Sequence, residues 1–184
     1  MFVYKDFAFY HMNKCGGTSI KKILKQLNLD FKQIGKGHHP LSSKKCNLNK
    51  YRIYTNIRNP YHRIVSMYEF ARQVIRGRHK NAPKDFEDFF YNYWLVNKPK
   101  TVEFYSQQEQ LFVGGKLPEN LTVVKLEDVD KYWPEIIKQH FNTEISFIPR
   151  MNMTIHGDPM EYFDKEMIEQ VKQKERWAVN QYML

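Results

Sequence analysis

A loop with two glycines and one lysine is the first segment of the chain whose residues could do chemistry. It runs from His11 to Ser19 with the sequence HMNKCGGTS, after a short apolar run and before a helical pattern. Gly16 and Gly17 let the main chain turn tightly and come close to a ligand, and the N–H groups that open a helix point toward an anion. Lys14 adds a cation on the same loop. The sequence therefore predicts a phosphate-binding loop.

The order of residues separates this loop from a Walker A loop. A Walker A loop carries its lysine after the last glycine, as in G-x-x-x-x-G-K-[ST], whereas Lys14 precedes both glycines. Thr18 and Ser19 can cap the helix and can also donate hydroxyl groups to an anion. For this segment alone, a Gly-Gly turn followed by a capped helix is the alternative interpretation.

A second candidate segment follows the next predicted strand. From Arg58 to Ser66 it has the sequence RNPYHRIVS. The guanidinium of Arg58 suits a phosphate, and Ser66 could offer its hydroxyl to the same anion if the chain folds back over it. The alternative treats Arg58 and Arg63 as solvated surface charges and Ser66 as an ordinary helix residue.

Together, the two segments resemble the donor-binding loops of sulfotransferases that use PAPS (3'-phosphoadenosine 5'-phosphosulfate). Residues 14–19, KCGGTS, are similar to the 5'-phosphosulfate loop P-K-x-G-G-T-S, and residues 58–66 are similar to the 3'-phosphate segment R-[DN]-P-x-x-R-x-x-S. The resemblance resumes more faintly at residues 123–128 and at Asn152. It is closest to the carbohydrate sulfotransferases, including the heparan 2-O-sulfating type.

This resemblance implies a P-loop-kinase-like sulfotransferase fold and a role for each matched residue. Lys14 would bridge the 5'-phosphate and the sulfuryl oxygens. The main chain of the following residues would hold the phosphate: Cys15, Gly16, Gly17, Thr18 and Ser19. Arg58 and Ser66 would bind the 3'-phosphate, which would favour PAPS and its product PAP (3',5'-diphosphoadenosine) over ATP.

Sulfuryl transfer also needs a base that takes the proton of the acceptor hydroxyl, beside positioning and electrostatic stabilisation. Residues 35–40, GKGHHP, lie between the two loops, at a place in the chain that resembles the segment where carbohydrate sulfotransferases carry a Gly-His or Lys-His base. An imidazole with a reference pKa near 6.5 can accept a proton near neutral pH. We predict His38 as the base and His39 as the second candidate. The alternative is a surface turn or adventitious metal binding, and His11 is expected to pack beneath the phosphate loop.

Alternating strand and helix patterns are expected to position these loops. Strands are predicted at residues 7–10, 52–57 and 121–125, and helices at residues 18–27, from Pro60 onward, and at 85–96, 102–112, 127–141 and 160–183. This alternation predicts a single α/β domain over residues 1–184, with a central parallel sheet flanked by helices. In such sheets, ligands bind beyond the carboxyl ends of the strands, where both loops lie.

The charge balance predicts an anionic partner. The 29 Lys and Arg exceed the 20 Asp and Glu, which gives a net charge of +9. A nucleotide, a sulfated glycan, nucleic acid or a membrane surface would each satisfy this charge.

Only Cys15 and Cys46 are present, which argues against a disulfide framework. No signal peptide or membrane-spanning window is recognised, so a soluble, cytoplasmic protein without a membrane anchor is expected. The His, Cys and carboxylate residues lack metal-ligand spacing, so no metal is expected.

Acceptor recognition leaves alternatives open. A basic stretch comprises Arg72, Arg76, Arg78, His79, Lys80 and Lys84. It suits an anionic glycan, or it is a solvated helix end. An aromatic group comprises Phe89, Phe90, Tyr91, Tyr93 and Trp94. It could stack on sugar rings, but its spacing favours a core face.

We therefore predict an enzyme that transfers a sulfuryl group from PAPS to a hydroxyl acceptor, with a glycan as the favoured acceptor. Two other classes stay open. A nucleotide-binding kinase would share the phosphate loop, although the position of Lys14 argues against it. A non-catalytic basic module that binds nucleic acid or glycan would use the net charge, but no zinc-finger or RNP pattern is present.

Overall fold

The computed structural model describes residues 1–35, 37–75, 83–96, 104–151 and 157–183. Its contacts divide the chain into two compact units. Unit 1 comprises Met1–Arg58 and Gln110–Asn152, and unit 2 comprises Asn59–Glu109 and Met153–Leu184. The expectation of one domain over residues 1–184 stays a prediction.

Unit 1 is built on a five-stranded sheet with the strand order β3-β1-β2-β4-β5. The strands are β1 (Phe2–Tyr4), β2 (Phe7–Tyr10), β3 (Lys32–Gln33), β4 (Arg52–Ile57) and β5 (Leu121–Lys125). β2, β4 and β5 run parallel to one another, whereas β1 pairs antiparallel with both β2 and β3. The α/β class and the three predicted strands are therefore confirmed, and the sheet is mixed because β1 reverses its direction.

β1, which forms a hairpin with the predicted strand β2, was not predicted from the sequence. Tyr4 pairs with Phe7 across the two-residue turn of Lys5 and Asp6, in which Lys5 has a φ of 50°. Two-residue turns with positive φ match the twist of the strands they join. The apolar run in β1 is only three residues long, which is too short to predict a strand from periodicity.

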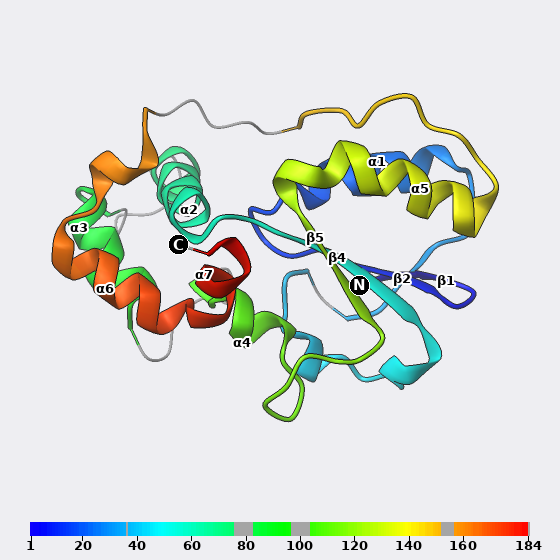
Figure 1. Ribbon diagram of the computed structural model, residues 1–184, viewed down its shortest axis with the longest axis horizontal. Helices are drawn as coiled ribbons and strands as arrows, with labels where there is room; N and C mark the ends of the chain where they lie inside the picture. Colours follow the sequence, from blue (N-terminus) through cyan, green and yellow to red (C-terminus); the bar gives the residue numbers. More distant parts are fainter. Residues whose placement is uncertain (36, 76–82, 97–103, 152–156, 184) are drawn as a thin grey trace. The chain divides into compact units, whose positions relative to one another are not determined.

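Two helices cover one face of this sheet. α1 (Gly17–Gln26) and α5 (Val129–Phe141) lie side by side along the strands in Figure 1. The buried core between helices and sheet contains Phe7, Phe9, Ile20, Ile23, Leu24, Tyr54, Val124, Val129, Trp133, Ile136, Ile137 and Ile148. The apolar residues of α1 recur at spacings of three and four, so they form a single stripe toward the strands. Short 3-10 turns occur at Leu41–Ser43, Leu48–Lys50 and Leu126–Asp128.

Unit 2 is helical in its described residues. It contains α2 (Pro60–Ile75), α3 (Phe86–Phe89), a π-helical turn η3 (Phe90–Trp94), the 3-10 turn η6 (Pro159–Tyr162), α6 (Lys165–Lys174) and α7 (Arg176–Tyr182). α4 (Gln107–Leu111) begins in unit 2 and ends in unit 1. The helix predicted at 160–183 is therefore interrupted, and the one predicted at 102–112 is shorter in the described part.

The sequence dipeptide Asn59-Pro60 explains where α2 begins. The Asn59 side-chain oxygen accepts hydrogen bonds from the main-chain N–H groups of Tyr61 and His62, at 3.0 and 3.4 Å. Pro60 is the first helical residue, where its missing N–H has no intrahelical partner to lose. The helix that carries Ser66 therefore starts directly after the end of β4.

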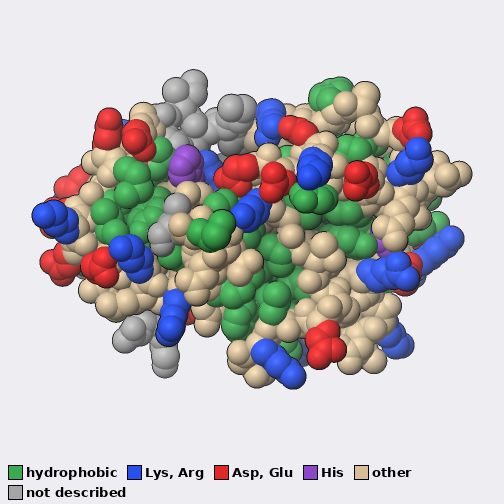
Figure 2. Space-filling view, in the orientation of Figure 1, with side chains coloured by type: hydrophobic (Ala, Val, Ile, Leu, Met, Phe, Trp, Pro, Cys, Tyr) green, Lys and Arg blue, Asp and Glu red, His purple; other side chains and the backbone are tan. Residues whose placement is uncertain are grey.

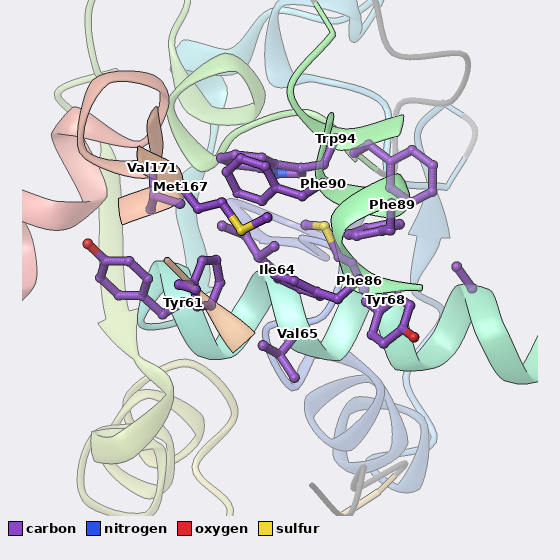
Figure 3. Close-up of a cluster of buried hydrophobic side chains, with 14 residues drawn as sticks. Tyr61, Ile64, Val65, Tyr68, Phe86, Phe89, Phe90, Trp94, Met167 and Val171 are labelled. Atoms are coloured by element: carbon purple, nitrogen blue, oxygen red, sulfur yellow. The ribbon is translucent and has the colours of Figure 1, made fainter. Parts of the chain in front are cut away.

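The predicted aromatic group belongs mainly to the core of unit 2. Phe89, Phe90 and Trp94 are fully buried and pack with α2 and α6 in the cluster of Figure 3. Tyr91 and Tyr93 are partly buried against the same cluster. Complete burial prevents the first three side chains from stacking on a sugar, so the core interpretation holds for them.

The predicted basic stretch is only partly described. Four of its residues lie outside the described ranges, as does Asn152 of the fainter resemblance: Arg76, Arg78, His79 and Lys80. Arg72 forms an ion pair with Glu69 at 2.8 Å. On the face shown in Figure 2, Lys and Arg side chains are interspersed with Asp and Glu. Among the helices of the described ranges, none is long and apolar enough to cross a membrane.

Candidate functional site

The loop between β2 and α1 turns through two left-handed residues, Lys14 with a φ of 60° and Gly16 with a φ of 72°. Gly16 is the N-cap of α1, and its carbonyl accepts a hydrogen bond from the N–H of Ser19 at 3.1 Å. Glycine has no side chain that could occupy the N–H groups of the first turn. Those groups and the positive end of the helix dipole form a place where an anion is stabilised.

Neither glycine of the loop has room for a side chain. A Cβ atom on Gly16 would lie 2.5 Å from Cδ1 of Leu126, and one on Gly17 would lie 1.9 Å from Cδ2 of His11. Both distances are far below van der Waals contact, so any other residue would displace its neighbour. The close packing of Gly17 places the His11 ring directly against the start of α1, as the sequence predicts for His11.

Two other loop side chains point into unit 1. Cys15 is buried, and its thiol donates to the carbonyl oxygen of Asn13 at 3.4 Å. Ser19 is also buried, and its Oγ accepts a hydrogen bond from the N–H of Met151 at 3.2 Å. The side chains of Cys15 and Ser19 are therefore bonded within unit 1, and the role of their main chain as an anion ligand stays a prediction.

His11 is held as a neutral imidazole. Its ring stacks on Phe9 at a centroid distance of 6.1 Å and meets the ring of His38 edge-on at 4.7 Å. Burial, and to a lesser extent the nearby His38 and Lys21, together lower the pKa of His11 to about 3. His11 therefore carries no charge at neutral pH and links the phosphate loop to His38.

The main-chain carbonyl of His11, directly after β2, orients the ring of His38. Its Nδ1 lies 3.1 Å from the carbonyl oxygen of His11. A carbonyl oxygen can only accept, so Nδ1 carries the proton and the neutral ring keeps its lone pair on Nε2. His39 is exposed, and it contacts the sheet through its carbonyl oxygen, which accepts from the Tyr10 hydroxyl at 3.2 Å. The two predicted bases therefore differ, and only for His38 do the contacts orient the ring.

Arg58, the first residue of the second predicted segment, contacts the phosphate loop within unit 1. β2 and β4 are parallel neighbours, so the loops that follow them lie at the same edge of the sheet. Arg58 Nη1 donates to the carbonyl oxygen of Lys14 at 3.4 Å. Ser66 is buried on α2 and belongs to unit 2. A joint 3'-phosphate site of Arg58 and Ser66 stays a prediction.

Arg63 is not the solvated charge that one interpretation of the sequence expects. Its side chain is fully buried, and Nη1 lies 3.1 Å from Oε1 of the equally buried Glu175. Both terminal nitrogens of Arg63 donate to the carbonyl oxygen of Tyr105 at 3.1 Å. Glu175 Oε2 accepts from the N–H of Gln107 at 3.0 Å. That interpretation is wrong for Arg63, whose guanidinium instead ties together three segments of unit 2.

Asn56 is a residue of this region that the sequence analysis does not single out. It lies near the carboxyl end of β4, is 2% exposed, and accepts a hydrogen bond from the Trp133 indole N–H at 2.7 Å. The available signal was an amide within a predicted buried strand, two residues before Arg58.

A cavity of about 670 Å³ is lined by the segments that lead into β4 and β5, at the amino ends of these two strands. It is lined by Cys46, Asn47, Leu48, Asn49, Val113, Lys116, Leu117, Pro118, Glu119 and Asn120. None of these residues belongs to the predicted site. Within the described ranges, no group of three or more His, Cys, Asp or Glu side chains is placed to hold a metal ion.

Among known proteins, a solved structure is similar to this chain, whereas no sequence comparison finds a match. No protein-family model matches the chain, and no curated protein sequence matches it. Among solved structures, it is similar to the crystal structure of mouse sulfotransferase SULT7A1 complexed with PAP, with a TM-score of 0.60 and 12% identity. The similarity covers 96% of this chain and 86% of the mouse chain. The chain therefore has the α/β fold of that sulfotransferase.

Proposed function

We propose that the protein is a sulfotransferase that moves a sulfuryl group from PAPS to a hydroxyl acceptor. The observation that carries this proposal is the loop of Lys14 to Gly17 at the start of α1, within a fold that it shares with a sulfotransferase complexed with PAP. The lysine precedes the two glycines, which supports a sulfotransferase loop over a Walker A loop.

The residues of the loop fit a donor that carries a phosphate. The N–H groups at the start of α1 and the left-handed turn at Gly16 would hold the 5'-phosphate, while Lys14 would neutralise the charge that spreads over the sulfuryl oxygens. Arg58 is beside Lys14 in unit 1 and would bind the 3'-phosphate, with Ser66 as the second predicted ligand. This set of residues would favour PAP over a nucleotide without a 3'-phosphate.

His38 is the residue that we assign as general base. Its Nε2 would take the proton from the acceptor hydroxyl while the hydroxyl oxygen forms a bond to sulfur. The bond between sulfur and the bridging phosphate oxygen breaks in line, and PAP leaves with that electron pair. PAPS supplies the activated sulfuryl group. The hydrogen bond from Nδ1 to the His11 carbonyl supports this assignment because it holds the tautomer that a base requires.

A glycan is the acceptor class that we propose. Two observations support it: the resemblance of the loops to the carbohydrate branch, and a net charge of +9, which suits an anionic polysaccharide. The buried aromatic residues of unit 2 do not contribute to this argument.

Calorimetric titration with PAP, ATP and 5'-AMP tests the donor site. We expect micromolar binding of PAP and weak binding of 5'-AMP. Arg58→Ala should weaken PAP binding by about tenfold or more, the scale of one lost charge-assisted hydrogen bond. Arg52→Ala is the matched control, because Arg52 lies at the opposite end of β4 and is exposed beside Asp6.

Two results would contradict the proposal. Failure of the wild-type protein to bind PAP at modest salt would remove the donor site. Magnesium-dependent binding of ATP in preference to PAP would instead favour a kinase.

A further inference from the structure

Asn56 combines burial with an unsatisfied donor. Its side chain is 2% exposed on β4, which lies between β2 and β5 in the sheet. Among the described residues, its Nδ2 has no hydrogen-bond partner, although the atom is buried from solvent. An unpaired buried donor costs stability and is uncommon in folded proteins, so its presence needs a reason.

The orientation of this amide is determined by its neighbour. Trp133 is fully buried on α5, and its indole N–H can only donate. It donates to Oδ1 of Asn56 at 2.7 Å. Because a flipped amide would put two donors together, Nδ2 must be the atom on the other side, and its N–H groups must point away from Trp133.

The unpaired nitrogen lies beneath the phosphate loop. Nδ2 is 3.9 Å from the position that a Cβ atom on Gly16 would take. Gly16 is the N-cap of α1, so the positive end of the amide dipole is next to the turn that opens the helix. The amide and the helix end thus present the same sign of charge to the anion site.

We propose that Asn56 is a positioning residue for the anion on this loop. Its buried dipole acts through the Gly16 turn, in a region of low dielectric where a fixed dipole has a larger effect than in water. The inference rests on the proposed function where the anion is the 5'-phosphate of the donor. It adds a residue of the sheet, close to Gly16, to the main-chain groups and Lys14 of the loop itself.

Two variants test this role without leaving the indole N–H of Trp133 unpaired. Asn56→Leu combined with Trp133→Phe replaces both hydrogen-bonding partners with apolar groups, so that neither partner is left as an unpaired polar group; the remaining cost in stability is the space that the smaller Phe ring leaves at the fully buried Trp133 position. Asn56→Asp keeps an acceptor for Trp133 but replaces the donor with a carboxylate. Thr55→Val is the control, because Thr55 is equally buried on β4 and its Oγ1 donates to the Tyr10 carbonyl.

The measurements are the thermal midpoint without ligand and the dissociation constants of inorganic phosphate and PAP. The double variant should have a lower midpoint, because Phe is smaller than the buried Trp133, but it should be fully folded at the temperature of the titration and bind phosphate and PAP about three- to tenfold more weakly, the scale of one neutral hydrogen bond. Asn56→Asp should bind both more weakly still at pH 7.5. Thr55→Val should lower the midpoint and leave both dissociation constants unchanged.

The outcomes separate this inference from the proposed function. Wild-type affinity in both Asn56 variants, or a loss of affinity that only follows a loss of folded protein, would overturn the role of Asn56 alone. Phosphate binding that depends on Asn56, without binding of PAP, would overturn the proposed function and support the inference. A wild-type protein that binds neither anion would overturn both.

Discussion

His38 and His39 are adjacent in the chain, but their rings have different surroundings. The Nδ1 of His38 donates to the carbonyl oxygen of His11, and the two rings meet edge-on. His39 has an exposed side chain and contributes its main-chain oxygen to the Tyr10 hydroxyl. A base must have both the right tautomer and a held orientation, and these contacts supply both for His38.

His38→Asn tests this assignment with little change of structure. The Asn amide can donate to the His11 carbonyl as Nδ1 does, but it has no basic nitrogen. We expect the turnover of PAPS with a glycan acceptor to fall by about 10²–10⁴-fold, with the dissociation constant of PAP unchanged. The measurement is the rate of PAP release, together with calorimetry.

His39→Asn is the control for that change. Its turnover should stay at the wild-type value, because the contact of His39 with the sheet is made by the main chain. Equal losses in both variants would contradict the choice of His38, and a loss confined to His39→Asn would reverse it.

At the scale of elements, one buried ion pair connects the helices of unit 2. Arg63 on α2 contacts Glu175, the residue between α6 and α7, and both contact the segment that leads into α4. A buried pair of this kind is not strong evidence for net stabilisation, but removal of one partner leaves an uncompensated charge in the core. The pair therefore makes the arrangement of these helices sensitive to either residue.

Arg63→Met should lower the free energy of unfolding by about 3–5 kcal/mol, because Glu175 would be left buried and unpaired. The double variant Arg63→Met with Glu175→Gln should recover more than half of that loss, since the substituted amide is neutral and its oxygen can still accept from the Gln107 N–H. Urea unfolding of the three proteins measures this difference.

An exposed ion pair provides the comparison. Lys138 and Glu144 are 2.7 Å apart with side chains 63% and 82% exposed. Lys138→Met should change the free energy of unfolding by less than about 1 kcal/mol. A similarly small effect of Arg63→Met would show that Arg63 has no structural role.

At the scale of the whole molecule, stability should depend on pH through histidines whose pKa is lowered by burial. Burial lowers the pKa of His11 to about 3 and also lowers the pKa of His140. Between pH 6.5 and 3, the unfolded chain binds a proton that folded His11 does not bind, so acid favours unfolding. Above the reference pKa, both states are neutral and His11 contributes no pH dependence.

Urea unfolding at pH 7.5 and pH 5.0 checks this prediction. His11 alone should reduce the free energy of unfolding by about 2 kcal/mol over this interval. His11→Gln removes that contribution, while the effects of His140 and the carboxylates remain in both proteins. The variant should therefore lose about 2 kcal/mol less than the wild type on acidification. The same pH dependence in both proteins would contradict the neutral, buried state of His11.

Local signals determined much of this protein from the sequence alone. Strands at residues 7–10, 52–57 and 121–125 were predicted with the bounds that the structure has, because buried strands are short apolar runs between turn signals. The loop at residues 14–19 and the Asn59 cap of α2 likewise depend on residues that are close together in the chain. Together, these features were sufficient to predict the fold class.

Only the tertiary structure decided which polar residues are buried and which partners they meet. Arg63 reaches Glu175, Trp133 orients Asn56, and the His11 carbonyl selects the tautomer of His38. Each of these pairs joins residues far apart in the chain, and an isolated arginine, amide or histidine has the same local pattern whether it is solvated or buried. Long-range packing removes water from these groups. In the absence of water, their hydrogen bonds become stronger and the loss of a partner costs more stability.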